Sequence, residues 1–292
     1  MHYVNTYREL KKFQRVSMRN RMRALALDGL SFLHASGASK YLRIPRVQFL
    51  YIHHTFTDEE KALETLLKKL QEHHVFISYS EAVEKVLSGN IDKPYIVFSS
   101  DDGFRNNLKA GEILQRFNVN ACFFLNPALI GQNNYDIIRK HCEEKLHFPP
   151  VQFMDWHEVE QLQKQGHEIG AHTMWHIDIG KAGMQEVEND LKNCYRILHE
   201  KCGKALHFAF PYGLFGNFNE AARKSVFETG FVSCASAERG CHLPHNQPMA
   251  REELCIRRDH VILGWKPEHI VYFLQKSAKT ANYNNNFFPY QR

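Results

Sequence analysis

Two short segments of the chain contain residue types suited to metal-assisted hydrolysis. The first is the acidic pair Asp101 and Asp102, which is followed by Gly103. The second contains His172 and His176, four residues apart. A catalytic zinc site commonly takes three protein ligands from His and carboxylate side chains and keeps one position for water. Asp102, His172 and His176 can supply these ligands. Asp101 then remains as the general base for the water.

Both segments follow predicted strands. Residues 95–98 form an apolar run that ends shortly before Asp101, and residues 168–170 form a short strand that leads to His172. In a barrel of β/α units, the carboxyl ends of the strands lie on one side, so the two segments are expected to converge. If His172 and His176 lie on one helical turn, their spacing places both rings on the same face.

The rest of the chain alternates between strand and helix patterns. We predict strands at 47–52, 95–98, 121–125, 168–170, 206–210, 231–234 and 254–257. We predict one helix after a cap at Asp58 and others over 106–117, 156–165, 184–202, 217–228 and 267–278. This alternation predicts an α/β fold with a parallel sheet and right-handed crossovers.

The composition limits the class of protein. With 292 residues, 43% of them hydrophobic and 24% charged, the chain can bury a substantial core. A net charge of +5 is too small to favour nucleic acid as a partner. Seven cysteines without paired spacing predict reduced thiols and a cytoplasmic location. No apolar run approaches the ~20 residues of a transmembrane helix.

We predict three parts of the chain: a basic, helical N-terminal extension over 1–45, one catalytic domain over 46–280 with an excursion at about 126–153, and an Asn-rich tail over 281–292. The extension contains a basic patch made of Lys11, Lys12, Arg15, Arg19, Arg21 and Arg23. A solvated helix face explains such a stretch. Peripheral contact with anionic lipid or with a phosphorylated substrate is the alternative. The sequence does not indicate an oligomeric state.

Three segments resemble, in their order, the first three motifs of the polysaccharide deacetylases, the NodB-homology family or carbohydrate esterase family 4. They are Ser-Ser-Asp-Asp-Gly-Phe at 99–104, Gly-Ala-His-Thr-Met-Trp-His at 170–176 and Phe-Ala-Phe-Pro-Tyr-Gly at 208–213. The resemblance covers about residues 47–260. It implies a distorted (β/α) barrel and a divalent metal, usually Zn²⁺, with Co²⁺ or Ni²⁺ as alternatives. The implied reaction is hydrolytic removal of N-acetyl, sometimes O-acetyl, groups from sugars.

The resemblance also implies a role for individual residues. By position, Asp101 resembles the general base of the family. Asp102, His172 and His176 resemble its metal ligands. Tyr212 resembles the residue whose backbone N–H stabilises the tetrahedral oxyanion, a role that suits a donor held rigidly where charge develops.

Two roles stay open. Many members of the family carry an Arg in the third motif that orients the base, but the matching residue here is Ala209, so the group that holds Asp101 is not identified. The leaving amine needs a proton, commonly from a His. The late Leu-x-His motif that supplies it in many members is absent. Another branch draws this His from the first strand, so His53 is the favoured acid, with His54 and His260 as alternatives.

The substrate is less well specified. Trp175, Trp156 and Pro211 are candidates for contact with a sugar ring, although packing in the core is the alternative for both Trp side chains. The implied substrate is an acetylated amino sugar in a glycan or glycan precursor, with a nucleotide- or lipid-linked form as one option. Two other functions stay open: metal-dependent hydrolysis of a different C–N bond, as in a cyclic imide or purine-derived substrate, and a non-catalytic sugar-binding role.

Overall fold

The computed structural model describes residues 2–13, 22, 25–31, 38–247 and 249–289. Four basic residues of the N-terminal stretch lie outside the described residues: Arg15, Arg19, Arg21 and Arg23. No helix in the described part of the chain combines the length and the apolar character that crossing a membrane requires.

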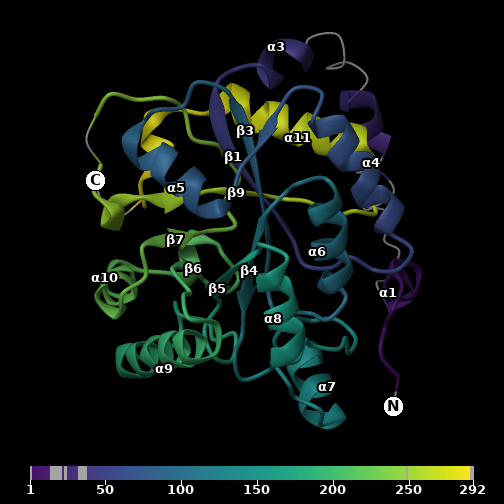
Figure 1. The fold of residues 1–292 in the computed structure, drawn as a ribbon, viewed down its shortest axis with the longest axis vertical. Helices are drawn as coiled ribbons and strands as arrows, with labels where there is room; N and C mark the ends of the chain where they lie inside the picture. Colours follow the sequence, from purple (N-terminus) through teal and green to yellow (C-terminus); the bar gives the residue numbers. More distant parts are fainter. Residues whose placement is uncertain (1, 14–21, 23–24, 32–37, 248, 290–292) are drawn as a thin grey trace.

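Within these residues, nine strands form one sheet in which all paired strands run parallel (Figure 1). The strands are β1 (Arg46–Ile52), β2 (Val75–Phe76), β3 (Pro94–Ser100), β4 (Ala121–Leu125), β5 (Glu168–Ala171), β6 (His207–Ala209), β7 (Ser233–Ala235), β8 (Cys255–Ile256) and β9 (Arg258–His260). Their order is β8-β7-β6-β5-β4-β3-β1-β9, and β2 pairs with the start of β3. The sequence pattern anticipated this parallel arrangement.

One segment brings the two ends of the sheet together. β8 pairs with β7, while β9, separated from β8 by Arg257 alone, pairs with β1. The predicted strand at 254–257 therefore matches only the first half of this segment. The break has a local cause, because the Arg257 N–H donates to His242 Nε2, 3.2 Å away, and not to a neighbouring strand. The result is a nearly closed parallel barrel, which confirms the predicted fold class.

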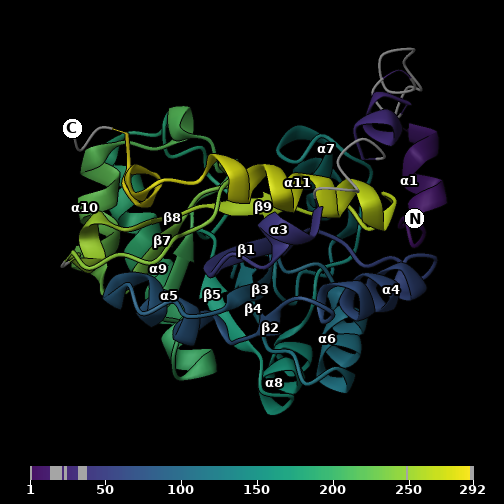
Figure 2. The same ribbon diagram turned by 90° about the horizontal axis from the view of Figure 1, so that it is seen from above.

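Helices surround the strands (Figures 1 and 2). They are α1 (Tyr7–Phe13), α3 (Ala38–Leu42), α4 (Glu60–Leu70), α5 (Tyr79–Ser88), α6 (Asn107–Arg116), α7 (Tyr135–Glu144), α8 (Trp156–Lys164), α9 (Met184–Cys202), α10 (Glu220–Thr229) and α11 (Pro267–Thr280). Of these, α5 was not predicted, and α7 lies inside the excursion that was expected to be irregular. Asn134 begins α7 by accepting the N–H groups of Asp136 and Ile137 with its side chain.

Alternate residues of the strands face two separate cores. On β3, Ile96 and Phe98 pack with the helices outside the barrel, whereas Tyr95 and Val97 pack inside it. The inner core also contains apolar residues of α5, so this helix packs against the barrel interior. Because both faces of the strands are buried, the strands appear in the sequence as continuous apolar runs.

The helix cap predicted at Asp58 is wrong in one respect. α4 begins after Glu59, while Asp58 accepts the N–H groups of Tyr7 and Arg8, 2.7 and 3.1 Å away. Asp58 therefore caps α1 and ties the N-terminal segment to the barrel. The apolar face predicted for α4 is confirmed, since Leu63, Leu66, Leu67 and Leu70 are all buried.

Candidate metal centre and active site

A cavity of about 200 Å³ lies at the carboxyl ends of the strands. Loops that follow β1, β3, β5 and β6 form its walls, together with β9 and residues 145–148 after α7. Six residues singled out from the sequence line it: His53, Asp101, Asp102, His172, His176 and Tyr212. The predicted convergence of the motifs is therefore present in the structure.

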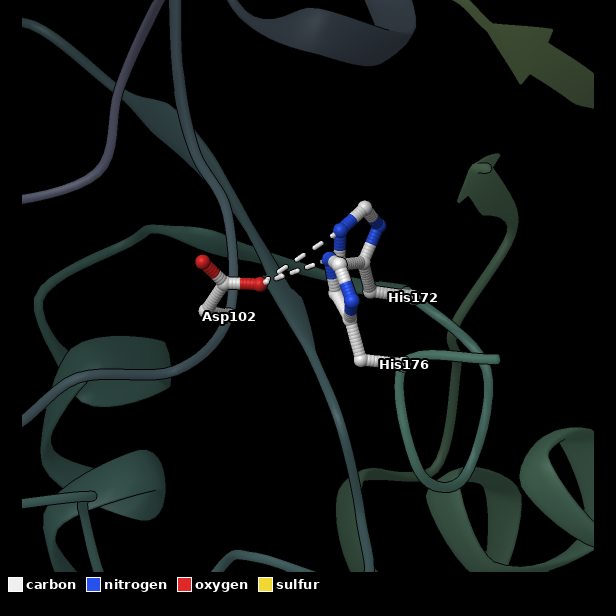
Figure 3. Close-up of side chains that lie close together, drawn as sticks. All are labelled: Asp102, His172 and His176. Atoms are coloured by element: carbon white, nitrogen blue, oxygen red, sulfur yellow. Dashed lines mark ion pairs between the residues drawn. The ribbon is translucent and has the colours of Figure 1, made fainter. Parts of the chain in front are cut away.

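Asp102, His172 and His176 point toward one another (Figure 3). Asp102 Oδ1 lies 3.5 Å from the Nε2 atom of each imidazole, and all three side chains are buried. They are the one group of three His, Cys, Asp or Glu residues in the described chain whose potential ligand atoms lie within 4.8 Å of one another. The His pair lies on a loop and not on a helical turn, because Thr173 and His176 have φ of 62° and 53°.

Two polar atoms of this group lack a hydrogen-bond partner in the described chain. His172 Nδ1 donates to the Ala209 carbonyl at 2.7 Å, which leaves its Nε2 lone pair facing Asp102. Asp102 Oδ1 and His176 Nδ1 are buried without a hydrogen-bond partner. Burial lowers the pKa of His172 to about 4, and burial together with the neighbouring Asp101 raises the pKa of Asp102. Two neutral imidazoles and one carboxylate fit a divalent metal, which would also offset the cost of an ionised Asp102.

Two side chains from outside the loop that carries His172 and His176 form hydrogen bonds with its backbone. Asp190 on α9 is buried and accepts the Met174 N–H at 2.9 Å. The Asn126 side chain donates to the carbonyl groups of His172 and Thr173. Neither residue was identified from the sequence, because both act through the backbone of the loop and carry no motif of their own.

Asp101 has a partner that sequence reasoning missed. Arg258 on β9 forms two hydrogen bonds with its carboxylate, 2.7 and 2.8 Å long, and both residues are buried. Arg258 also donates to the Ser236 carbonyl, and its guanidinium lies over the Tyr51 ring, 4.5 Å from the centroid. Burial, the largest single effect, would raise the pKa of Asp101, but the charge and hydrogen bonds of Arg258, together with His172 and His53, lower this pKa to about 2.

The three His candidates for the general acid lie in different surroundings. His53 lines the metal cavity. His54 lies among aromatic rings and bonds to the Asn106 side chain, and burial lowers its pKa to about 3. His260 lines a second cavity of about 280 Å³, and its Nε2 atom lies 3.1 Å from His53 Nδ1. Of the three, His53 alone faces the metal ligands.

Tyr212 lines the cavity and has a left-handed backbone with φ of 62°. In the described chain its N–H has no hydrogen-bond partner, and its ring packs against the His176 ring with centroids 4.7 Å apart. Pro211 precedes it and is buried. Trp175 is 45% exposed, and Trp156 lies under the Lys201 side chain. None of Pro211, Trp175 and Trp156 lines the metal cavity, so contact with a substrate stays a prediction for all three.

Known proteins share parts of this sequence. The family model of the polysaccharide deacetylases matches residues 88–233, half of the chain. A peptidoglycan-N-acetylglucosamine deacetylase of Bacillus cereus is 28% identical over 157 residues, which are 53% of this chain and 48% of that protein. A chitooligosaccharide deacetylase of Sinorhizobium fredii is 31% identical over 61 residues, or 20% and 28% of the two chains. The chain thus spans about half the length, or less, of these curated relatives.

Two solved structures resemble the whole barrel. The Streptococcus pyogenes deacetylase PplD in complex with acetate has a TM-score of 0.61 at 16% identity, covering 80% of this chain and 98% of that one. IcaB from Ammonifex degensii also has a TM-score of 0.61 at 16% identity, covering 79% and 97%. At this identity the likeness concerns the fold alone. The match to residues 88–233 shows more: the chain belongs to the polysaccharide deacetylase family.

Proposed function

We propose that the protein is a metal-dependent hydrolase that removes N-acetyl groups from an amino-sugar-containing glycan or glycan precursor. One observation carries the proposal: a buried Asp102–His172–His176 group shares a cavity with a carboxylate that Arg258 keeps ionised. Metal ligands and a separate base are the two requirements of hydrolysis by an activated water. Family membership favours an acetylated sugar as the substrate.

Asp102, His172 and His176 would hold the metal, with Zn²⁺ favoured and Co²⁺ or Ni²⁺ as alternatives. When bound, the metal supplies Lewis-acid activation of the attacking water and of the acetamide carbonyl. Asp101 accepts a proton from that water. The two hydrogen bonds from Arg258 fix the direction of the Asp101 carboxylate and favour its ionised form, which replaces the missing Arg of the third motif.

Two further groups complete the proposed chemistry. The Tyr212 N–H, unpaired in the described chain, donates a hydrogen bond to the oxyanion as the carbonyl becomes tetrahedral. His53 protonates the departing amine, because it follows β1, the strand next to β3, and lines the same cavity as Asp101. His54 is a weaker candidate because its ring bonds to Asn106 and is packed among aromatic side chains.

The substrate class follows from the relatives. The Bacillus cereus and Sinorhizobium fredii proteins are named for N-acetylglucosamine in peptidoglycan and for chitooligosaccharide, so N-acetylglucosamine compounds are the first substrates to test. A nucleotide- or lipid-linked form is the finer proposal, with Trp175, Trp156 and Pro211 as candidate sugar contacts outside the cavity. A cytoplasmic location is also a proposal. It is supported by seven free cysteines, all of them described, with none in a disulfide.

The deciding experiment is a screen for acetate release. The purified protein is loaded with Zn²⁺, Co²⁺ or Ni²⁺ and incubated with free, nucleotide-linked, lipid-linked and polymeric N-acetylglucosamine. Metal-dependent acetate release supports the proposal. Ammonia or ring-opened products from cyclic imides or purine derivatives, without acetate release, would favour the other amidohydrolase. Absence of stoichiometric metal binding would favour a sugar-binding role.

Two variants separate the base from the metal ligands. Asp101→Asn is expected to keep the bound metal and to lose activity by about 10³-fold, because a neutral amide cannot accept the water proton. Asp102→Ala is expected to lose both metal and activity, because the group then has only two ligands. Metal content by atomic spectroscopy and acetate release are measured on the same samples. Metal-dependent turnover retained in Asp101→Asn would overturn the mechanism.

A further inference from the structure

We propose that His260 is a positioning residue: it accepts a hydrogen bond from His53 and thereby fixes the ring and the acidity of the proton donor. This inference rests on the proposed function. The juxtaposition that carries it is direct, because His53 Nδ1 lies 3.1 Å from His260 Nε2. The two rings meet edge to face, with centroids 4.9 Å apart and an interplanar angle of 86°.

The barrel closure builds this pair. β1 and β9 are neighbours, and their register places Tyr51 opposite His260. The His260 ring stacks on Tyr51 with centroids 4.7 Å apart and an angle of 19° between the planes. The Tyr51 ring also meets the His53 ring edge to face, with centroids 5.4 Å apart, and lies under the guanidinium of Arg258. Because Arg258 and His260 are two residues apart on one strand, they share a side of it. β9 therefore supplies the partner of the base and the partner of the acid.

The contact between His53 Nδ1 and His260 Nε2 leaves one nitrogen of His53 available as a proton donor. His53 lines both the metal cavity and the second cavity, whereas His260 lines the second cavity and not the metal cavity. With Nδ1 of His53 engaged by His260, Nε2 is the nitrogen left for a substrate. His260 is thus placed to act through His53 and not on the substrate itself.

An imidazole acceptor differs from a carboxylate in charge. A carboxylate would stabilise the protonated His53 strongly and make it a weaker acid, whereas a neutral imidazole orients the ring without adding negative charge. Burial lowers the pKa of His53, and Asp101 partly opposes this effect. The charged or titratable groups that interact with the pair, stack on it or line the two cavities with it are Asp101, Asp102, Arg258, Arg239, Tyr7, Tyr51, Glu59, His54, Lys145, His147, His172, His176 and Tyr212.

The proton balance needs no further reactant. As the C–N bond breaks, the departing nitrogen takes the bonding pair and receives the proton from His53 Nε2. His53 changes from imidazolium to neutral imidazole and keeps its Nδ1 proton, which stays hydrogen-bonded to His260 Nε2. His260 keeps its own Nδ1 proton throughout and neither gains nor loses one.

The first test requires no substrate. The imidazole groups of ¹⁵N-labelled, zinc-loaded protein are titrated by NMR in the wild type and in His260→Asp, His260→Asn and His260→Phe. A carboxylate at 260 is expected to raise the pKa of His53 by at least about one unit, and the phenyl ring to remove the hydrogen-bond signature of Nδ1. The matched control is His157→Asp, since His157 is 72% exposed on α8. An unchanged His53 in all His260 variants would overturn the inference.

The second test is kinetic, on N-acetylglucosamine pentamer. Loss of the acceptor in His260→Phe is expected to lower kcat by about 10- to 100-fold with little change in KM, and His260→Asn to recover part of it. Since His53 acts in its protonated form, activity falls as pH rises through its pKa, and His260→Asp should move this alkaline limb to higher pH. A His260→Phe variant with the wild-type kcat and the wild-type alkaline limb of the pH–activity profile would contradict the inference. If no variant or wild type releases acetate, the proposed function fails while the NMR result still decides the His pair.

Discussion

Strand β5 has a carboxylate–imidazole cluster at each end, and the two clusters differ in how their polar atoms are satisfied. At its start, Glu168 accepts hydrogen bonds from the backbone and the hydroxyl of Ser80. His207 bonds through Nε2 to Ser80 and through Nδ1 to Ser233, at 2.9 and 2.8 Å. Each functional atom of this cluster therefore has a partner inside the protein.

The cluster beyond the end of β5 also combines a carboxylate with imidazoles, but some of its polar atoms have no hydrogen-bond partner within the described residues. Asp102 Oδ1 is buried without a hydrogen-bond partner, and Nε2 of His172 and Nε2 of His176 each lie 3.5 Å from it. Asp102, Thr173, His176 and Tyr212 all have left-handed backbone, with φ of 73°, 62°, 53° and 62°. Unpaired buried atoms and such backbone each cost free energy, and they persist where a ligand compensates. Buried polar atoms without a hydrogen-bond partner, and not residue types alone, distinguish the candidate metal centre from a structural cluster.

The largest effect should come from adding metal. If the Asp102 cluster binds Zn²⁺ only in the folded state, a concentration 1,000 times Kd raises the free energy of unfolding by about 4 kcal/mol. Urea unfolding with zinc and with a chelator measures the difference. Asp102→Ala should abolish this increase, whereas Glu168→Ala should retain it. An equal increase in Asp102→Ala would remove the distinction between the two clusters.

A smaller effect is expected at the other end of β5. Glu168→Ala leaves Ser80 and His207 without their carboxylate partner and should lower the free energy of unfolding by about 1–3 kcal/mol. Activity per folded molecule should stay at the wild-type level, because this cluster does not line the metal cavity. Chemical denaturation and acetate release are compared on the same preparation. Loss of activity without loss of stability would instead assign Glu168 to the reaction.

The smallest effect concerns Glu59, a buried carboxylate that has a partner yet is poorly solvated. It accepts the Phe56 N–H at 3.2 Å, but burial raises its pKa to about 7. A raised carboxyl pKa favours the protonated folded state, so stability should fall as pH rises from about 4.5 to about 7. Glu59→Gln should remove this dependence and stabilise the protein by about 1 kcal/mol at pH 8, with no gain at pH 4. Denaturant unfolding at the two pH values tests it. A gain at pH 4 equal to that at pH 8 would contradict the assignment.

The sequence anticipated features that depend on short segments. The apolar run before Asp101 and the strand before His172 each end where the ligands begin, so local patterns located the candidate metal centre. Asp58 shows the limit of such patterns: a good cap residue sits next to the start of α4 but caps α1, 50 residues away in sequence. The helix α7 carried a readable signal, since Asn134 is a favourable cap before an amphipathic stretch.

Features that depend on barrel closure were not predictable in the same way. Arg258 is 157 residues from Asp101, and the sequence around it resembles neither the third motif nor a binding motif. Its side chain meets Asp101 only because β9 pairs with β1 in one register. The His53–His260 contact depends on the same register, so both histidines appeared as alternatives when they are in fact neighbours.

The position of β8 and β9 late in the sequence also determines when their residues are synthesised. The proposed metal ligands are complete once residue 176 has been synthesised, whereas Arg258 and His260 come only with β9. A ribosome therefore releases the ligand set long before the groups that orient the base and the acid. A chain cut before Arg258 would keep the three proposed ligand residues in its sequence and lose the partner of the proposed base. The proposed metal ligands and the groups that contact the proposed base and acid are therefore encoded in separate parts of the chain.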